Sequence, residues 1–397
     1  MTSRLFDPLA EQTPDALLAL ITAHREDPRP DKLDLGVGIY RDAAGRTPIF
    51  AAIRGAERAK LDVQTSKAYL GAEGDIGFIE RLAPIVFGSG LPGDGRLIGL
   101  QTPGGTAALR LAADLIATTG PARVWLGEPS WTNHAPILAA AGIEVRRYRY
   151  LDAGRVAVDA MLSALASARP GDVVLLQGAS HNPSGVEPSE AELRAIVAAV
   201  AGRGLVPLVD LAYQGLGRGL DADAAFARAL FDACDEAILA YSCSKNFGLY
   251  RERTGALWVR SASASANRIV RQNLLQLARS LWSMPPDHGA ALVRMVLESE
   301  QLTAQWRAEL DAMRARLDAL RGDLAEAIPS LPRGTGLFAL LDIGPDVVTA
   351  LRDRYGIYAA PDGRINIAGL SSSADVATLS RAVAQVRVAP QTHQTSR

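Results

Sequence analysis

The 397-residue sequence contains very little cysteine and no long apolar run. Its only cysteines, Cys234 and Cys243, favour reduced thiols in a cytoplasmic protein over a disulfide framework. No apolar run reaches about 18 residues, so we expect no membrane span. The start, MTSRLFDPLAEQTPDALLALITAHRED, has acidic residues and no basic leader, which predicts an arm and an amphipathic helix rather than a secretory signal.

An excess of charge of one sign is also missing. The formal net charge is −1, which argues against a nucleic acid or a membrane surface as the binding partner. The five histidines show neither an HExxH motif nor the spacing of Cys/His metal ligands. The sequence therefore predicts no metal site.

Lysine is rare among the basic residues. Only four of the 42 are lysine, and the other 38 are arginine. Arginine stays protonated at any working pH, whereas a lysine amine can lose its proton and attack a carbonyl group. Lys245 is the only lysine after position 67, and it follows an apolar run in YSCSKNFGLYRER. Lys245 is therefore a candidate nucleophile.

The middle of the chain alternates short apolar segments with helical ones, which predicts an α/β fold with a mostly parallel sheet. The predicted strands are 96–100, 123–127, 143–148, 172–177, 205–210, 237–242 and 255–259. Helical periodicity marks 106–117, 189–201 and long helices from about 268 to 320, with a break at 283–286. After Pro332 we expect a smaller α+β unit with helices near 347–355 and 373–388. At this length two domains are expected.

Polar residues follow several of the predicted strands, at the edge where open α/β sheets bind ligands. The Gly-Gly-Thr of QTPGGT, at 101–106, can direct backbone N–H groups at an anion. Asp210 can balance a ligand cation, although it can equally cap the next element. Tyr213 and Asn182 have structural alternatives of the same kind, as a packed core tyrosine and a turn residue. Arg364, on a short strand, can bind a carboxylate through two parallel hydrogen bonds.

These signals together fit one cofactor. Pyridoxal phosphate requires a lysine for covalent attachment, a carboxylate at its pyridine nitrogen, a donor at its ring oxygen and an anion site for its phosphate. Lys245, Asp210, Tyr213 and the Gly-Gly-Thr turn supply one group for each requirement.

Almost the whole chain resembles the class I, fold-type I pyridoxal-phosphate aminotransferases, in the subgroup of aspartate and aromatic-amino-acid transaminases. The matching segments, in order, are LDLGVGIYRD, SKAYLGAEG, QTPGGTAALR, PSWTNH, SHNPSG, DLAYQG, YSCSKNFGLYRERTGA, SMPPDHGA and RINIAGL. The resemblance implies a three-layer fold with a large, mostly parallel-sheet domain and a smaller α+β domain. We expect an N-terminal arm at 1–14, a small domain from 15–46 with 313–397, and a large cofactor-binding domain at 47–312.

The resemblance also implies roles at the cofactor. Lys245 would bind it covalently and then act as general base and acid, while Asp210 would keep the pyridine nitrogen protonated. Tyr213 and Asn182 would bond the ring oxygen, and Trp131 would stack on the ring and border the substrate. The phosphate would be held by Gly105, Thr106, Ser242, Arg253 and Tyr69 of the partner subunit.

The substrate would be bound at both of its ends. Arg364, with Asn182 and the backbone of Gly38, would bind the α-carboxylate. Arg279 would reach across a homodimer to the distal carboxylate of a dicarboxylic substrate.

Three positions depart from the subgroup's pattern. Gln177 stands where a histidine is usual behind the ring, and Met284 and Ala68 replace polar residues. The last two changes make the pocket less polar and favour aromatic side chains, although Met284 can also be a packing residue. Gln177 affects the tuning of the ring rather than the choice of cofactor.

We therefore predict a homodimeric, cytoplasmic aminotransferase that transfers the amino group of tyrosine, phenylalanine or aspartate to 2-oxoglutarate by a ping-pong mechanism. Alternatives are a strictly aspartate-specific transaminase, a pyridoxal-phosphate-dependent β-lyase or decarboxylase, and a non-catalytic protein that binds the cofactor. A dinucleotide-binding oxidoreductase is disfavoured, because GLGRGL at 215–220 lacks the third glycine of the fingerprint at the required spacing.

Overall fold

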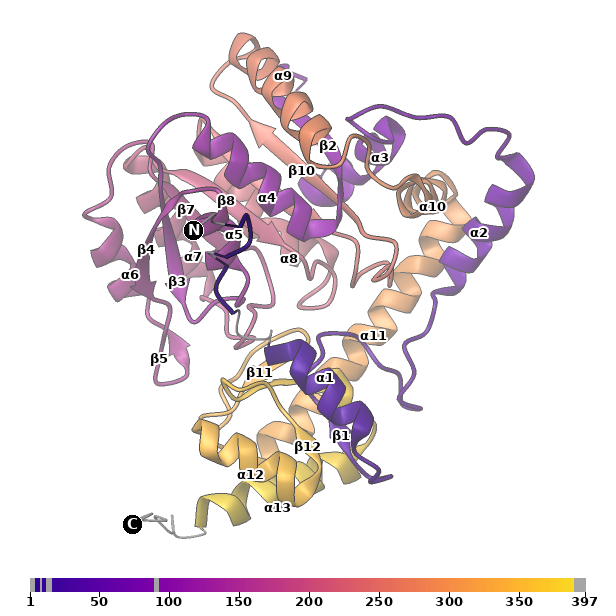
Figure 1. The fold of residues 1–397 in the computed structure, drawn as a ribbon, viewed down its shortest axis with the longest axis vertical. Coiled ribbons are helices and arrows are strands. Elements are labelled where there is room, and N and C mark those ends of the chain that lie inside the picture. The colour runs from indigo at the N-terminus through magenta and orange to yellow at the C-terminus, as the bar shows by residue number, and fades with distance from the viewer. Residues whose placement is uncertain (1–3, 8, 12–15, 89–92, 389–397) are drawn as a thin grey trace.

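The computed structural model describes residues 4–7, 9–11, 16–88 and 93–388. Figure 1 shows a larger body built around a sheet and a smaller one beneath it, with the long helix α11 (Glu300–Ala327) running from one to the other. Of the arm expected at 1–14, residues 1–3, 8 and 12–14 lie outside the described residues.

The larger body contains a seven-stranded sheet in the order β2-β10-β9-β8-β7-β3-β4. Its strands are β2 (Leu97–Pro103), β3 (Arg123–Glu128), β4 (Glu144–Arg149), β7 (Val173–Gln177), β8 (Val206–Leu211), β9 (Ala237–Ser242) and β10 (Thr254–Arg260). β10 is antiparallel to both of its neighbours, and the pairs from β9 to β4 are parallel. All seven predicted strands are confirmed.

Helices cover both faces of this sheet, which explains its continuous apolar strands. One face packs against α4 (Gly104–Ala117), α5 (His134–Ala140) and α9 (Ala264–Leu281). The other face packs against α3 (Ile76–Phe87), α6 (Val158–Leu165), α7 (Glu190–Gly202) and α8 (Leu220–Ala233). Every residue of β9 is buried between the two layers. The expected three-layer α/β architecture is confirmed.

The smaller body brings together segments from the two ends of the chain (Figure 1). β1 (Leu33–Asp34) pairs in parallel with β12 (Ile357–Tyr358), and β11 (Phe338–Leu340) pairs antiparallel with β13 (Arg364–Asn366). The helices of this region are α1 (Ala16–Glu26), α12 (Pro345–Tyr355), α13 (Ser373–Val388) and the short η1 (Ile367–Gly369). The helices predicted near 347–355 and 373–388 are therefore confirmed.

Two further helices, α2 (Ala51–Val63) and α10 (Asp287–Glu298), pack on each other and on α11. The hairpin strands β5 (Leu151–Asp152) and β6 (Arg155–Val156) complete the described elements. None of the described helices has the length and apolar character needed to cross a membrane.

Candidate active site

A cavity of about 180 Å³ opens at the carboxyl ends of the parallel strands. The register pairs Gln177 of β7 with Asp210 of β8, and Leu211 of β8 with Tyr241 of β9, so the loops after these strands begin at one edge. The cavity is lined by Gly105, Thr106, Leu109, Trp131, Gln177, Asn182, Asp210, Ala212, Tyr213, Ser242, Ser244, Lys245 and Arg253. Nine of the residues singled out in the sequence as cofactor ligands are therefore neighbours in space.

Lys245 lies in the turn after β9 and borders this cavity. Its Nζ is 4.9 Å from the centroid of the Tyr213 ring. Burial lowers the pKa of the amine to about 8; the charge of Asp210 opposes that shift, and the charge of Arg253 adds to it. With that value, about one amine in ten is uncharged at pH 7. The uncharged form of an amine is the form that can attack a carbonyl group, and burial makes this form more abundant at Lys245 near neutral pH.

Asp210, near the end of β8, is 9% exposed. Its Oδ2 accepts a hydrogen bond from Nε2 of His134, at 2.9 Å, and the His134 side chain is fully buried at the start of α5. Sequence reasoning missed His134, because histidines were considered only as metal ligands. The available signal was its place in PSWTNH, three residues after Trp131 in the loop that follows a predicted strand.

Asn182 connects the cavity to the smaller body. Its Nδ2 donates to the Tyr213 hydroxyl at 3.4 Å, and its Oδ1 accepts from Nη1 of Arg364 at 3.2 Å. Burial is the main cause that raises the pKa of the Tyr213 phenol, which therefore keeps its proton. Arg364 also donates to the carbonyl of Gly36 at 2.8 Å and lies over the Phe338 ring. Its Nε is buried without a partner among the described residues, which leaves a donor for a ligand.

The opposite end of the cavity is suited to an anion. Gly105 and Thr106 open α4, where the helix dipole favours negative charge. Arg253 donates to the Ser244 hydroxyl at 3.4 Å, and the Ser244 amide donates to the Ser242 hydroxyl at 3.2 Å. A Cβ at Gly105 would lie 3.0 Å from Cβ of Ser242, so only glycine lets these segments approach so closely.

Besides Arg364, which contacts the cavity residue Asn182, three of the predicted residues do not line the cavity of their own chain. Tyr69 is 91% exposed. Arg279, at the end of α9, donates to the Ser283 hydroxyl. Gly38 lies beside Phe338, where a Cβ would be 2.8 Å from the ring.

Among the described residues, no group of three His, Cys, Asp or Glu side chains is arranged to hold a metal ion.

Comparisons with known proteins agree with this geometry. The sequence pattern of the family described as aminotransferase class I and II matches residues 30–382. The tyrosine aminotransferase of Rhizobium meliloti (strain 1021) is 50% identical over 378 residues, which are 93% of this chain and 97% of the relative. The aspartate aminotransferase of Escherichia coli (strain K12) is 37% identical over 396 residues, covering 96% and 100%.

A solved structure is similar over nearly the whole chain. The aromatic-amino-acid aminotransferase from Burkholderia pseudomallei, covalently bound to pyridoxal phosphate, has a TM-score of 0.92 and 36% sequence identity. The alignment covers 97% of this chain and 100% of that one. The chain belongs to the aminotransferase class I and II family.

Proposed function

We propose that this protein is a pyridoxal-phosphate-dependent aminotransferase. It transfers the amino group of an aromatic amino acid, tyrosine or phenylalanine, or of aspartate, to 2-oxoglutarate by a ping-pong mechanism. One observation carries the proposal: an amine with a lowered pKa and a buried carboxylate, Lys245 and Asp210, border the same cavity. Relatives named tyrosine and aspartate aminotransferase support both kinds of donor.

The residues present fit pyridoxal phosphate. The glycine-lined start of α4, with Ser242 and Arg253, suits a phosphate, and Lys245 suits an aldehyde. When bound, the cofactor supplies a carbonyl carbon for covalent attachment and a ring that withdraws electrons from the substrate. The protein supplies binding, orientation and proton transfer.

Lys245 performs the proton transfer. Its amine has a pKa of about 8, close to the working pH, which is the condition for an efficient general base and acid. Asp210 would hold the pyridine nitrogen, and the hydrogen bond from His134 keeps its carboxylate in position. Tyr213 and Asn182, which contact each other in the cavity, would donate to the ring oxygen, and Trp131, which also lines the cavity, would stack on the ring.

Arg364 binds the α-carboxylate of the substrate. Its guanidinium is bonded to Asn182, which lines the cavity, and its Nε has no partner among the described residues. Arg364 has no acidic partner among the described residues, and a buried charge without one is costly, so a substrate carboxylate would relieve that cost on binding. Gly38 lies close enough to Phe338, over which Arg364 stacks, to border the same end.

The active form is a homodimer with its sites at the subunit interface. Tyr69 and Arg279 are both exposed and lie outside the cavity of their own chain, which supports delivery of both to the partner's site. Tyr69 of the partner subunit completes the phosphate site, and Arg279 of the partner subunit binds the distal carboxylate of aspartate or glutamate. The cytoplasm is the proposed compartment, because Cys234 and Cys243 are both buried, unpaired thiols.

The test is direct. Purified protein should be yellow and should lose that colour when glutamate is added, and kcat/KM should be measurable for tyrosine, phenylalanine and aspartate with 2-oxoglutarate. A protein that stays colourless in excess pyridoxal phosphate would refute the proposal.

A further inference from the structure

Asn182 connects the two ends of the candidate site, and its backbone is bonded to a single side chain. The Asn182 amide donates to Oε1 of Gln177 at 2.8 Å, and the Asn182 carbonyl accepts from Nε2 of Gln177 at 2.9 Å. Gln177 is the last residue of β7, and these two backbone atoms have no other partner among the described residues. Asn182 is 4% exposed, so both atoms depend on Gln177 for the hydrogen bonds that water would otherwise supply.

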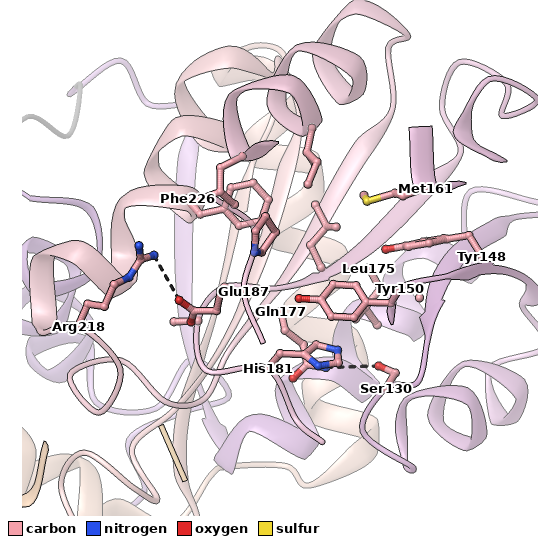
Figure 2. Close-up of a pocket in the computed structure, with 17 residues that line it drawn as sticks. Ser130, Tyr148, Tyr150, Met161, Leu175, Gln177, His181, Glu187, Arg218 and Phe226 are labelled. Atoms are coloured by element: carbon pink, nitrogen blue, oxygen red, sulfur yellow. Dashed lines mark hydrogen bonds and ion pairs between the residues drawn. The ribbon is translucent and has the colours of Figure 1, made fainter. Parts of the chain in front are cut away.

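The side-chain amide of Gln177 has only one possible orientation. A backbone N–H can only donate and a carbonyl can only accept, so the side-chain oxygen and nitrogen cannot be exchanged. The second hydrogen of Nε2 faces Oγ of Ser130, at 3.4 Å. Figure 2 shows these two side chains joined beside a small cavity of about 40 Å³. Both amide hydrogens of Gln177 are therefore bonded, which fixes the side chain that holds Asn182.

The side chain of Asn182 is oriented by its own partners. A guanidinium has no acceptor, so Oδ1 of Asn182 must face Nη1 of Arg364, at 3.2 Å. Nδ2 of Asn182 therefore faces the hydroxyl oxygen of Tyr213, at 3.4 Å. Since that oxygen accepts from Asn182, the phenol hydrogen stays free to donate to a ligand. The position of one amide thus affects both Tyr213 and Arg364.

We propose that Gln177 is a positioning residue for Asn182, whose backbone it holds at both polar atoms so that the Asn182 side chain meets Tyr213 and Arg364 together. This inference rests on the proposed function, because it concerns residues that would bind the cofactor and the substrate carboxylate. The role requires a donor and an acceptor at the end of a side chain of this length. Methionine has no donor and only a weak acceptor, and asparagine is shorter by one methylene, about 1.5 Å, so neither can make both bonds.

Hydrogen exchange of the cofactor-free protein tests the contact itself. Exchange of the Asn182 amide, measured at single-residue resolution by mass spectrometry, should be at least about tenfold faster in Gln177→Met than in the wild type, because the amide loses its only acceptor. Gln177→Asn should give the same result, and it serves in all the measurements if Gln177→Met fails to fold.

Ligand binding to the loaded enzyme tests the consequence for the site. The probe is 3-phenylpropanoate, a carboxylate with an aromatic ring and no amino group, which can occupy the site without reacting. Gln177→Met should raise its Kd about tenfold, the effect of one weakened hydrogen bond to a charged group. In an Asn182→Ala background the same substitution should change Kd by less than about twofold, because no side-chain amide remains to be positioned.

Gln214→Met is the matched control. Gln214 is another fully buried glutamine, bonded to the carbonyls of Ile85 and Leu220, and it has no hydrogen bond to Asn182. Its loss should lower the free energy of unfolding, as the loss of Gln177 does, because both substitutions leave a buried carbonyl without its donor. Gln214→Met should nevertheless leave the exchange of the Asn182 amide and the Kd of the probe unchanged.

An Asn182 amide whose exchange ignores Gln177→Met would overturn the inference, and so would an equal rise in Kd with and without the Asn182 side chain. A rise of the same size in Gln214→Met would assign the effect to lost stability and would also overturn it. Failure of the proposed function is separate: it would appear as a wild-type protein that takes up no pyridoxal phosphate, whereas hydrogen exchange of the cofactor-free protein tests the contact in either case.

Discussion

At Lys245, burial and the charge of Asp210 act on the pKa of the amine in opposite directions. Burial is the largest cause and lowers the pKa of the amine, and Asp210 raises it, which leaves a value of about 8 instead of the ordinary 10.5. These values determine whether the stability of the fold rises or falls with pH. Between about pH 8 and 10.5 the unfolded chain binds the proton more strongly, so stability rises with pH through that window. The fold therefore gives up some stability to hold a reactive amine.

The first prediction concerns that amine. In the cofactor-free protein, acylation of Lys245 should rise with pH to a midpoint near 8, because only the uncharged amine reacts. Mass spectrometry of peptides from samples labelled at different pH values measures it, and the exposed Lys67 in the same samples corrects for the reagent's own pH dependence. A midpoint near 10.5 would contradict the account.

The second prediction concerns Arg279. Arg279→Leu should lower kcat/KM for aspartate by about 100-fold, the effect of losing a paired, charge-assisted contact, and change phenylalanine turnover by less than about threefold. Arg268→Leu, an exposed arginine on the same helix, is the control and should affect neither substrate. Equal losses for both substrates would exclude a role in binding the distal carboxylate.

At the residue scale, rarity and position in the sequence pointed to candidates that lie in one cavity. Lys245 stood out because lysine is scarce, and Asp210 because it follows an apolar run. His134 was missed because its contact with Asp210 joins residues 76 positions apart in sequence. Gly36 was missed too, since its carbonyl meets Arg364 only when the two ends of the chain fold together.

At the scale of elements, the start of α4 is constrained by close packing. Gly104 has a φ of +81°, and a Cβ there would lie 2.6 Å from Nη2 of Arg253. The glycine therefore allows both the turn and the placement of the guanidinium at the anion end of the cavity.

The third prediction follows from this contact. Gly104→Ala should displace Arg253 and weaken pyridoxal-phosphate binding by at least about tenfold, because a charge-assisted bond is lost. Gly120→Ala is the matched control: φ is +112° and no atom lies within 4 Å of its Cβ, so it adds strain without a contact. Titration of the cofactor-free protein with pyridoxal phosphate should show a loss of affinity in Gly104→Ala and none in Gly120→Ala. Similar losses of affinity in both variants would mean that backbone strain, and not the contact with Arg253, weakens cofactor binding.

Element-scale prediction succeeded for the strands because each is an apolar run ended by turn residues. The order of the strands and the antiparallel direction of β10 could not be predicted from the sequence, since they depend on pairing between distant segments. The very short β1 and β12 carry too few residues for a periodic signal.

At the scale of the whole molecule, acid should destabilise the fold through His181. Burial lowers its pKa from 6.5 to about 3, so between these values the unfolded chain binds more protons and stability falls as pH falls. From pH 7 to pH 5 the contribution is about 2 kcal/mol.

The fourth prediction is that His181→Phe reduces the loss of unfolding free energy between pH 7 and pH 5 by about that amount. Phenylalanine keeps a ring against Tyr150, whose ring centroid lies 3.9 Å from that of His181. The substitution also removes the hydrogen bond between His181 and Ser184, but this loss lowers the free energy of unfolding equally at both pH values. Denaturant titrations at the two pH values measure the difference, with the exposed His288→Phe as control. An unchanged pH dependence would count against a buried, neutral His181.

The proposed homodimer needs an interface on the surface of the protein. Exposed apolar side chains include Leu61, Val63, Tyr69, Ile76 and Ile269. Such side chains are typical of a protein interface when they are grouped. The sequence could not predict this surface without the resemblance, because exposure depends on the folded chain.

The fifth prediction tests shared sites in a dimer. With aspartate, Lys245→Ala subunits should be inactive and Arg279→Leu subunits should keep only about a hundredth of the wild-type activity, but a refolded equal mixture should recover about a quarter of it. The hybrid has one complete site, formed by Lys245 of one subunit and Arg279 of the other. No recovery, with hybrids demonstrated by native mass spectrometry, would place both residues in the same chain's site.

The central claim is that the amine of Lys245 binds the aldehyde of pyridoxal phosphate. Borohydride reduction of the loaded protein, followed by peptide mapping, measures this bond directly. We predict one modified peptide, YSCSKNFGLYRER or a fragment of it, with the tag on Lys245. A tag on Lys32, Lys60 or Lys67 instead, or no tag at all, would contradict the account.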